Sequence, residues 1–262
     1  MKKKSQAFLL LVMTVLLLVV VSSRIAPKEA GMASGPAITD DPLPETAAPV
    51  TAAPPVVSEP AEPVALRELF PDSSTNDWNL QLVNNTYVLP SSFAPTVTKT
   101  RDGQYIDSRI SEALESMLAA AEAEGYTVCV RAAYRPFSTQ AYLFNGRASQ
   151  IQWGTSMSLL DAETEARKVI AYPGTSEHQL GLCADLMDAA DTSMTADTAK
   201  ALPLLLWLKE HCAEYGFILR YPEEKKEITG WFEPWHFRYV GTDAAAYMME
   251  NGICLEEFIQ QF

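Results

Sequence analysis

Residues 176–185 read SEHQLGLCAD, and residues 233–239 read EPWHFRY. Each segment contains one of the three histidines of the chain, His178 in the first and His236 in the second. Apolar residues predict short strands within or beside both segments, over Gly181–Met187 and Trp235–Val240. The two segments therefore combine expected strands with side chains that can carry chemistry.

Three residues of these segments have the chemistry of a metal site. His178, Asp185 and His236 offer two imidazole nitrogens and one carboxylate oxygen, which suit Zn²⁺ and leave a fourth position for water. Glu233 is a natural general base for that water, and the proline after it favours an extended conformation. The spacing alone leaves other interpretations open, because no HExxH-like pair is present. A capping or surface histidine and an ion-paired Asp185 are the alternatives.

Outward from these segments, helical and strand periodicities alternate along the chain. The mixture predicts an α+β fold rather than a single class. His211 lies late on one expected helix, where a cation is favourable. The expected helices are Ile110–Ala121, one beginning at Ser138, Asp161–Ala171, 203–215, Asp243–Asn251 and Leu255–Gln261, and the further strands are Tyr126–Arg131 and Phe217–Leu219.

The N-terminal residues have the composition of an export segment followed by a linker. Three lysines precede the apolar run Ala7–Val21, which predicts a signal peptide or signal anchor over residues 1–23. Residues 24–64 contain nine of the 17 prolines and no aromatic residue, so we expect a disordered linker. One domain over residues 65–262 remains, and it is expected outside the cytoplasmic membrane.

Composition excludes several classes of protein. The 262 residues carry 20 Lys and Arg against 33 Asp and Glu, a net charge of −13, which argues against binding nucleic acid. Three His and four Cys are too few for a zinc-finger array, a haem-rich carrier or a disulfide scaffold. Most of the acidic residues lie after residue 64, so the charge belongs to the domain.

The motif Ser-x-His-x-x-Gly-x-(small)-x-Asp, followed by Glu-Pro-Trp-His-(aromatic)-Arg-Tyr, resembles the VanY-type zinc D,D-carboxypeptidases of bacterial cell walls. The resemblance covers most of residues 78–262, and it includes Arg131–Phe144, Tyr215–Pro222 and Leu255–Phe258. It implies a small central, mostly antiparallel sheet flanked by helices, shared with the zinc domain of hedgehog proteins. It also implies one zinc ion per chain on His178, Asp185 and His236.

The same resemblance implies roles for four further residues. Glu233 matches the catalytic base, and Arg135 matches an arginine that stabilises negative charge developing on the attacked carbonyl oxygen. Gln140 matches a substrate-binding glutamine, and Ser176 a serine near the terminal carboxylate of the substrate. An ion-paired arginine and a helix-surface glutamine are the alternatives for Arg135 and Gln140.

The sequence departs from the family pattern around Arg135 and at Cys183, which stands where alanine is usual. The departures leave substrate selectivity open. Cys183 could face the same side of a strand as Asp185 and close the site as a fourth ligand, but we favour a small buried cysteine. Among the four cysteines of an exported domain, Cys212 and Cys254 are the preferred disulfide pair.

These observations predict a zinc carboxypeptidase that removes the terminal D-Ala from peptidoglycan stem peptides. The expected partners are the stem peptide and, through residues 1–23, the membrane; we expect a monomer. An L,D-carboxypeptidase or an endopeptidase would use the same catalytic residues but hydrolyse a different peptide bond of peptidoglycan. A non-catalytic wall-binding module is the alternative from another class. A serine hydrolase built on Ser176 lacks the Gly-x-Ser-x-Gly turn.

Overall fold

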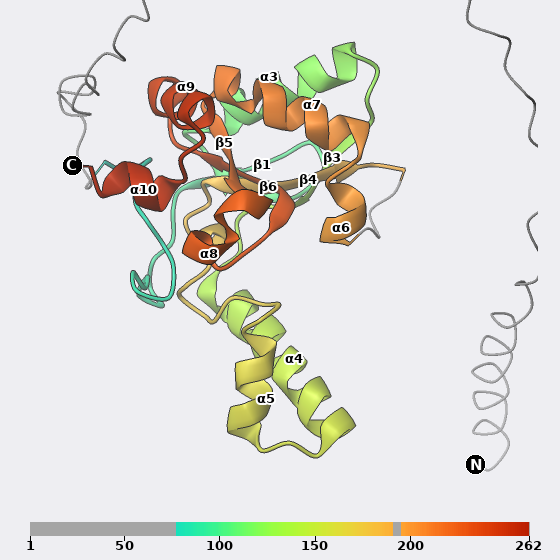
Figure 1. Cartoon of the computed structure of the whole chain (residues 1–262), viewed down its shortest axis with the longest axis vertical. Helices are drawn as coiled ribbons and strands as arrows, with labels where there is room; N and C mark the ends of the chain where they lie inside the picture. The colour runs from blue at the N-terminus through green and yellow to red at the C-terminus, as the bar shows by residue number, and fades with distance from the viewer. Residues whose placement is uncertain (1–76, 191–194, 262) are drawn as a thin grey trace, which may run out of the picture. The chain divides into compact units, whose positions relative to one another are not determined.

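The computed structural model describes residues 77–190 and 195–261 (Figure 1). The predicted export segment over residues 1–23 and the predicted linker over residues 24–64 lie outside these residues. In the part of the chain that is described, none of the helices is long and apolar enough to cross a bilayer. The elements are β1 (Val97–Lys99), β2 (Tyr105–Asp107), α3 (Ser111–Ala123), β3 (Val128–Ala132), α4 (Phe137–Thr155), α5 (Leu159–Ala166), η1 (Glu177–Gln179), β4 (Cys183–Asp188), α6 (Ala196–Ala199), α7 (Pro203–His211), η2 (Cys212–Tyr215), β5 (Phe217–Tyr221), η3 (Glu223–Lys225), α8 (Lys226–Thr229), β6 (Glu233–Tyr239), α9 (Thr242–Asn251) and α10 (Leu255–Ile259).

Four strands form an antiparallel sheet in the order β3-β4-β6-β5, and β1 pairs with β2 in a second, smaller sheet. The expected α+β fold with a small antiparallel sheet flanked by helices is confirmed. Pairing places Asp185 of β4 directly opposite His236 of β6. The register shifts after Val130 between β3 and β4 and after Leu219 between β5 and β6. Such irregularities bend a strand and re-aim its side chains.

One face of the four-stranded sheet is apolar and lies under α3 and α7 (Figure 1). Successive side chains of a strand point to opposite faces, so alternate residues of each strand enter this core. The side chains expected at helical spacing over Ile110–Ala121 are the ones that α3 packs against this face of the sheet. The core contains Leu114, Met117, Leu118 and Ala121 from α3, Leu204 and Leu208 from α7, and Val128, Val130, Ala184, Leu186, Phe217, Leu219 and Phe237 from the strands.

Two smaller apolar clusters complete the packing. Helices α4 and α5 form a hairpin that extends away from the sheet (Figure 1), and Phe144, Ala148 and Ala166 pack between them. Helices α9 and α10 pack with Leu80 and with Ile218 of the edge strand β5. The hairpin begins directly after β3 and returns before η1, so its base adjoins the site described below.

The turn between η1 and β4 depends on a glycine. Gly181 has a φ of +75°, a conformation that residues with a Cβ rarely adopt. A Cβ there would lie 3.1 Å from Cγ of Pro95 and 3.3 Å from the backbone nitrogen of Asp107. That nitrogen donates a hydrogen bond to the Gly181 carbonyl at 2.9 Å. Gly181 thus lets the chain turn from His178 into β4.

Two expectations are wrong in detail. The helix expected over Asp161–Ala171 is α5 over Leu159–Ala166, and Ser158 caps its start, where the backbone N–H of Asp161 donates to the Ser158 hydroxyl at 3.2 Å. The disulfide between Cys212 and Cys254 does not form, because all four cysteines are free thiols. Cys212 is buried in the core under α7, whereas Cys254 caps α10. The two thiols thus belong to different packing units.

Candidate metal centre and active site

The face of the sheet opposite the apolar core carries the ionisable residues of the two motifs. On β4, Asp185 alternates with the core residues Ala184 and Leu186, and on β6 His236 precedes the core residue Phe237. His178 lies on η1, the single turn before β4. The sheet and the adjoining turn therefore bring together the three side chains expected to bind metal.

Each imidazole turns one nitrogen toward the carboxylate of Asp185. Nε2 of His178 lies 3.4 Å from Oδ2, and Nδ1 of His236 lies 2.9 Å from Oδ1. The other nitrogen of His178, Nδ1, lies 2.6 Å from the carbonyl oxygen of Ala133, which fixes the orientation of the ring. Two imidazole nitrogens and a carboxylate at this spacing fit the donor set of a zinc site with three protein ligands.

Charge within the donor cluster favours a cation. Burial raises the pKa of Asp185, but the two imidazoles outweigh burial and hold this pKa below its usual range. Burial lowers the pKa of His178, whereas Cys183 and Asp185 raise it, to about 9 overall. The same two neighbours raise the pKa of His236 well above its usual value, against the effect of burial. Without metal the cluster therefore retains protons that a dication would displace.

Glu233 opens β6 beside the donors, with Oε2 at 3.7 Å from Nδ1 of His236. By strict alternation it would share the side of Phe237, but the register shift between β5 and β6 re-aims it. Its side chain remains 27% exposed. Burial raises the pKa of its carboxyl group; His236 opposes this shift and Asp185 adds to it. Glu233 is therefore a stronger proton acceptor than an ordinary surface glutamate.

A cavity of about 360 Å³ opens over these side chains. All seven residues that the sequence assigns to metal binding, catalysis or substrate binding line this cavity. Aromatic side chains and the base of the α4–α5 hairpin complete its wall. The lining includes Arg135, Gln140, Leu143, Val169, Ser176, Glu177, His178, Asp185, Tyr221, Trp231, Glu233, Trp235 and His236.

Arg135 is held at the cavity by its backbone and by Gln140. The backbone N–H of Arg135 donates to the carbonyl of His178 at 2.9 Å, and its Nη1 donates to Oε1 of Gln140 at 2.7 Å. Nε2 of Gln140 donates to the carbonyl of Ala171 at 2.6 Å. Because Gln140 is 1% exposed and uses both ends of its amide, it supports Arg135 in this arrangement. Ser176 is also buried, directly before η1.

Cys183 lies close to both imidazoles. Its sulfur and one nitrogen each from His178 and His236 lie within 4.8 Å of one another, a second grouping able to hold a metal. Burial raises the pKa of this thiol, but the two imidazoles lower it to about 7 overall. Asp185 lies 2.9 and 3.4 Å from the two imidazoles, so its carboxylate and the Cys183 thiol are both within reach of the expected metal site.

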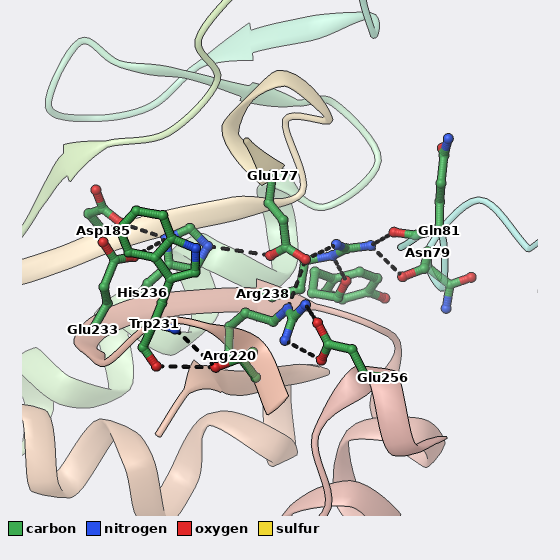
Figure 2. A network of polar contacts seen from close by, with 12 residues as sticks. Asn79, Gln81, Glu177, Asp185, Arg220, Trp231, Glu233, His236, Arg238 and Glu256 are labelled. Carbon is green, nitrogen blue, oxygen red and sulfur yellow. Dashed lines mark hydrogen bonds and ion pairs between the residues drawn. The ribbon is translucent and has the colours of Figure 1, made fainter. Parts of the chain in front are cut away.

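A buried network of charged residues lies behind His236, and sequence reasoning gave its members no role (Figure 2). Glu177, Arg220 and Arg238 are inaccessible to solvent, and Glu256 of α10 is 8% exposed. Charged residues are rarely buried so completely without partners. A signal for this network exists in the sequence, because Arg220 lies in the otherwise uncharged run from Phe217 to Tyr221.

Comparison of this sequence with known proteins identifies a family of cell-wall peptidases. The sequence profile of the family described as VanY, D-alanyl-D-alanine carboxypeptidase, matches residues 103–242. A D-alanyl-D-alanine carboxypeptidase of Enterococcus faecalis is 35% identical over 204 residues, which cover 78% of this chain and 74% of the relative.

Two solved structures have similar folds. One is a zinc-bound variant of the vancomycin-resistance D,D-pentapeptidase VanY, with 35% identity, a TM-score of 0.61, and coverage of 70% of this chain and 99% of the other. The second is the LD-carboxypeptidase LdcB, with 32% identity, a TM-score of 0.62, and coverage of 70% and 87%. Proteins similar to this chain therefore include enzymes named for two different bonds.

Proposed function

This chain belongs to the VanY family of D-alanyl-D-alanine carboxypeptidases, and we propose that it removes the terminal D-Ala from peptidoglycan stem peptides, with one zinc ion per chain. The observation that supports this most strongly is the convergence of His178, Asp185 and His236 at one cavity, with Glu233 beside them. The zinc-bound VanY structure and the named activity of the E. faecalis relative agree with it.

Zinc held by His178, Asp185 and His236 would supply a Lewis acid that polarises the scissile carbonyl and acidifies a water molecule. Glu233 takes the proton of the attacking water on its carboxylate and returns it to the leaving amine of D-Ala. Its raised pKa makes the carboxylate a better acceptor for the proton of water, and Glu233 then holds that proton until it is passed to the leaving amine.

Arg135 provides positive charge where the carbonyl oxygen becomes negative during attack. Its hydrogen bond to Gln140 orients the guanidinium toward the cavity, so we assign Gln140 a role that acts through Arg135. Ser176 lines the same cavity and is our candidate for contact with the terminal carboxylate of the substrate.

The substrate places the action of the enzyme outside the cytoplasm, because stem peptides belong to the cell wall. We propose that residues 1–23 direct this export and, if retained, anchor the domain at the membrane, with residues 24–64 as the tether. The support is in the sequence alone: three lysines precede the apolar run Ala7–Val21.

A second candidate function uses the same site to hydrolyse a different peptide bond. The similarity to the LD-carboxypeptidase LdcB favours an L,D-carboxypeptidase that trims tetrapeptides, and an endopeptidase would use the same groups. A non-catalytic module that binds the wall is the remaining alternative. The presence of Glu233 beside the three ligands argues against it.

Mass spectrometry of defined tri-, tetra- and pentapeptide stem peptides, incubated with the zinc-loaded domain, separates these possibilities. We expect loss of one D-Ala from the pentapeptide, its abolition by a chelator and its recovery when zinc is restored. Cleavage of the tetrapeptide alone would establish the L,D-enzyme. Tight binding of one zinc ion without hydrolysis of any peptide would establish the binding module.

A further inference from the structure

Glu177 is the residue through which the buried charge network reaches the metal centre (Figure 2). Its Oε2 lies 3.4 Å from Nε2 of His236. Both atoms are buried, and neither has a hydrogen-bond partner elsewhere in the described part of the chain. Each therefore faces the other as its available polar partner.

The two arginines occupy only one oxygen of this carboxylate. Nε of Arg220 and Nη1 of Arg238 both donate to Oε1 of Glu177, each at 2.8 Å. Oε2 is thus left for His236. The charge-assisted bonds also fix the plane of the carboxylate, because the two donors approach from separate strands, β5 and β6.

The outer members of the network hold the two arginines in place. Glu256 accepts from Nη1 and Nη2 of Arg220 at 2.8 and 2.6 Å. Nη2 of Arg238 donates to the carbonyl oxygens of Asn79 and Gln81 at 3.1 and 2.9 Å. Two carboxylates balance two guanidinium groups, so the network is neutral as a whole and survives burial.

We propose that Glu177 is a positioning residue for the metal ligand His236. A carboxylate facing Nε2 selects the imidazole tautomer that carries its proton there, which leaves the Nδ1 lone pair toward Asp185 and the cavity. The same contact limits rotation of the ring. The residue adjacent in sequence to one ligand, His178, thus orients a ligand that lies on a different strand.

This inference rests on the zinc site of the proposed function, and zinc affinity tests it directly. Glu177→Gln keeps the volume of the side chain and weakens the acceptor for Nε2. We expect the zinc dissociation constant of the purified, folded domain to rise about 10- to 100-fold in competition with a chromophoric chelator.

The matched control is Glu256→Gln, which removes the other carboxylate of the network without touching His236. It leaves Arg220 similarly uncompensated but keeps the carboxylate that faces His236, so we expect a much smaller rise in the zinc dissociation constant than in Glu177→Gln. Wild-type affinity in Glu177→Gln would overturn the proposal, and so would equal losses in the two variants.

A measurement on the wild-type chain covers the case in which Glu177→Gln does not fold. With ¹⁵N-labelled histidine and bound ¹¹³Cd²⁺, we expect cadmium coupling to Nδ1 of His236 and a proton on Nε2. Coupling to Nε2 of His236 would refute the role of Glu177. A chain that binds neither zinc nor cadmium would refute the zinc site, and with it the proposed function.

Discussion

The two faces of the four-stranded sheet use the same strands for opposite purposes. Leu186 of β4 and Phe237 of β6 enter the apolar core under α3 and α7. Their immediate neighbours Asp185 and His236 face the cavity, with Arg220 in the charge network behind them. Because alternation separates the two sets, the core fixes the donors without containing them. Stability and catalysis should therefore respond to substitutions on different faces.

The largest difference between an effect on catalysis and an effect on stability is expected at Glu233, which is not one of the proposed metal ligands. Glu233→Gln removes the proton acceptor while it keeps the size of the side chain. We expect kcat/KM for a D-Ala-D-Ala peptide to fall about 10²- to 10⁴-fold. Zinc content and melting temperature should stay at wild-type values.

Glu224→Gln provides a matched carboxylate control, since Glu224 is 62% exposed and forms a surface ion pair with Lys209 at 3.6 Å. We expect wild-type activity from it. Near-normal turnover in Glu233→Gln would contradict the mechanism, and loss of zinc would show that Glu233 is itself a ligand.

On the apolar face, the matched prediction concerns Leu186, which is fully buried. Leu186→Ala should lower the free energy of unfolding by about 2–5 kcal/mol, because it removes buried methyl groups and leaves a cavity. Urea denaturation measures the change. Zinc stoichiometry and kcat of the folded fraction should remain unchanged.

Substitution of the adjacent residue, Asp185, should have the opposite effect, on zinc binding rather than on folding. Asp185→Asn has the same shape but no anionic ligand, so we expect weaker zinc binding in a domain that still folds. The separation of the two faces would fail if Leu186→Ala lost zinc while still folded, or if Asp185→Asn unfolded the domain.

The apolar face was the more predictable from sequence, because its pattern is local. The spacing of Leu114, Met117 and Leu118 on α3 identifies the buried side of that helix without knowledge of the fold. The metal site was predicted for a different reason, because His178 and His236 lie in motifs that resemble a known family.

Long-range contacts mark the limit of that reasoning. Glu177 bonds Arg220 and Arg238, which are 43 and 61 residues away in the chain. No periodicity connects residues at such separations. The disulfide expected between Cys212 and Cys254 failed for the same reason, since cysteine counts carry no information about distance.

A smaller effect is expected in how the stability of the metal-free domain changes with pH. In the folded chain the pKa of His178 is raised to about 9, so its stabilising contribution is complete below pH 6.5 and disappears as the pH rises through 9. His236 contributes with the same sign. The lowered pKa of Cys183, about 7, acts in the opposite direction, but one thiol does not offset two imidazoles.

We therefore expect the melting temperature of the chelator-treated domain to fall between pH 6.5 and 9. The zinc-loaded domain serves as the control, because metal binding requires deprotonated imidazoles and gains from the same rise in pH. A melting temperature of the metal-free domain that stays constant or increases over this range would contradict the assigned proton positions.

The smallest effect is expected at Cys183, which lies on the same face of β4 as Asp185 and close to both imidazoles, where it could compete with Asp185 for the metal. If Asp185 is the third ligand, Cys183→Ala should retain wild-type zinc affinity and kcat/KM. The Co²⁺-loaded wild-type domain should then lack the near-ultraviolet band of sulfur-to-metal charge transfer. A band that is present in the wild type and absent in Cys183→Ala would make the thiol a ligand. A fourth protein ligand would close the position that water needs, and the centre would then be structural rather than catalytic.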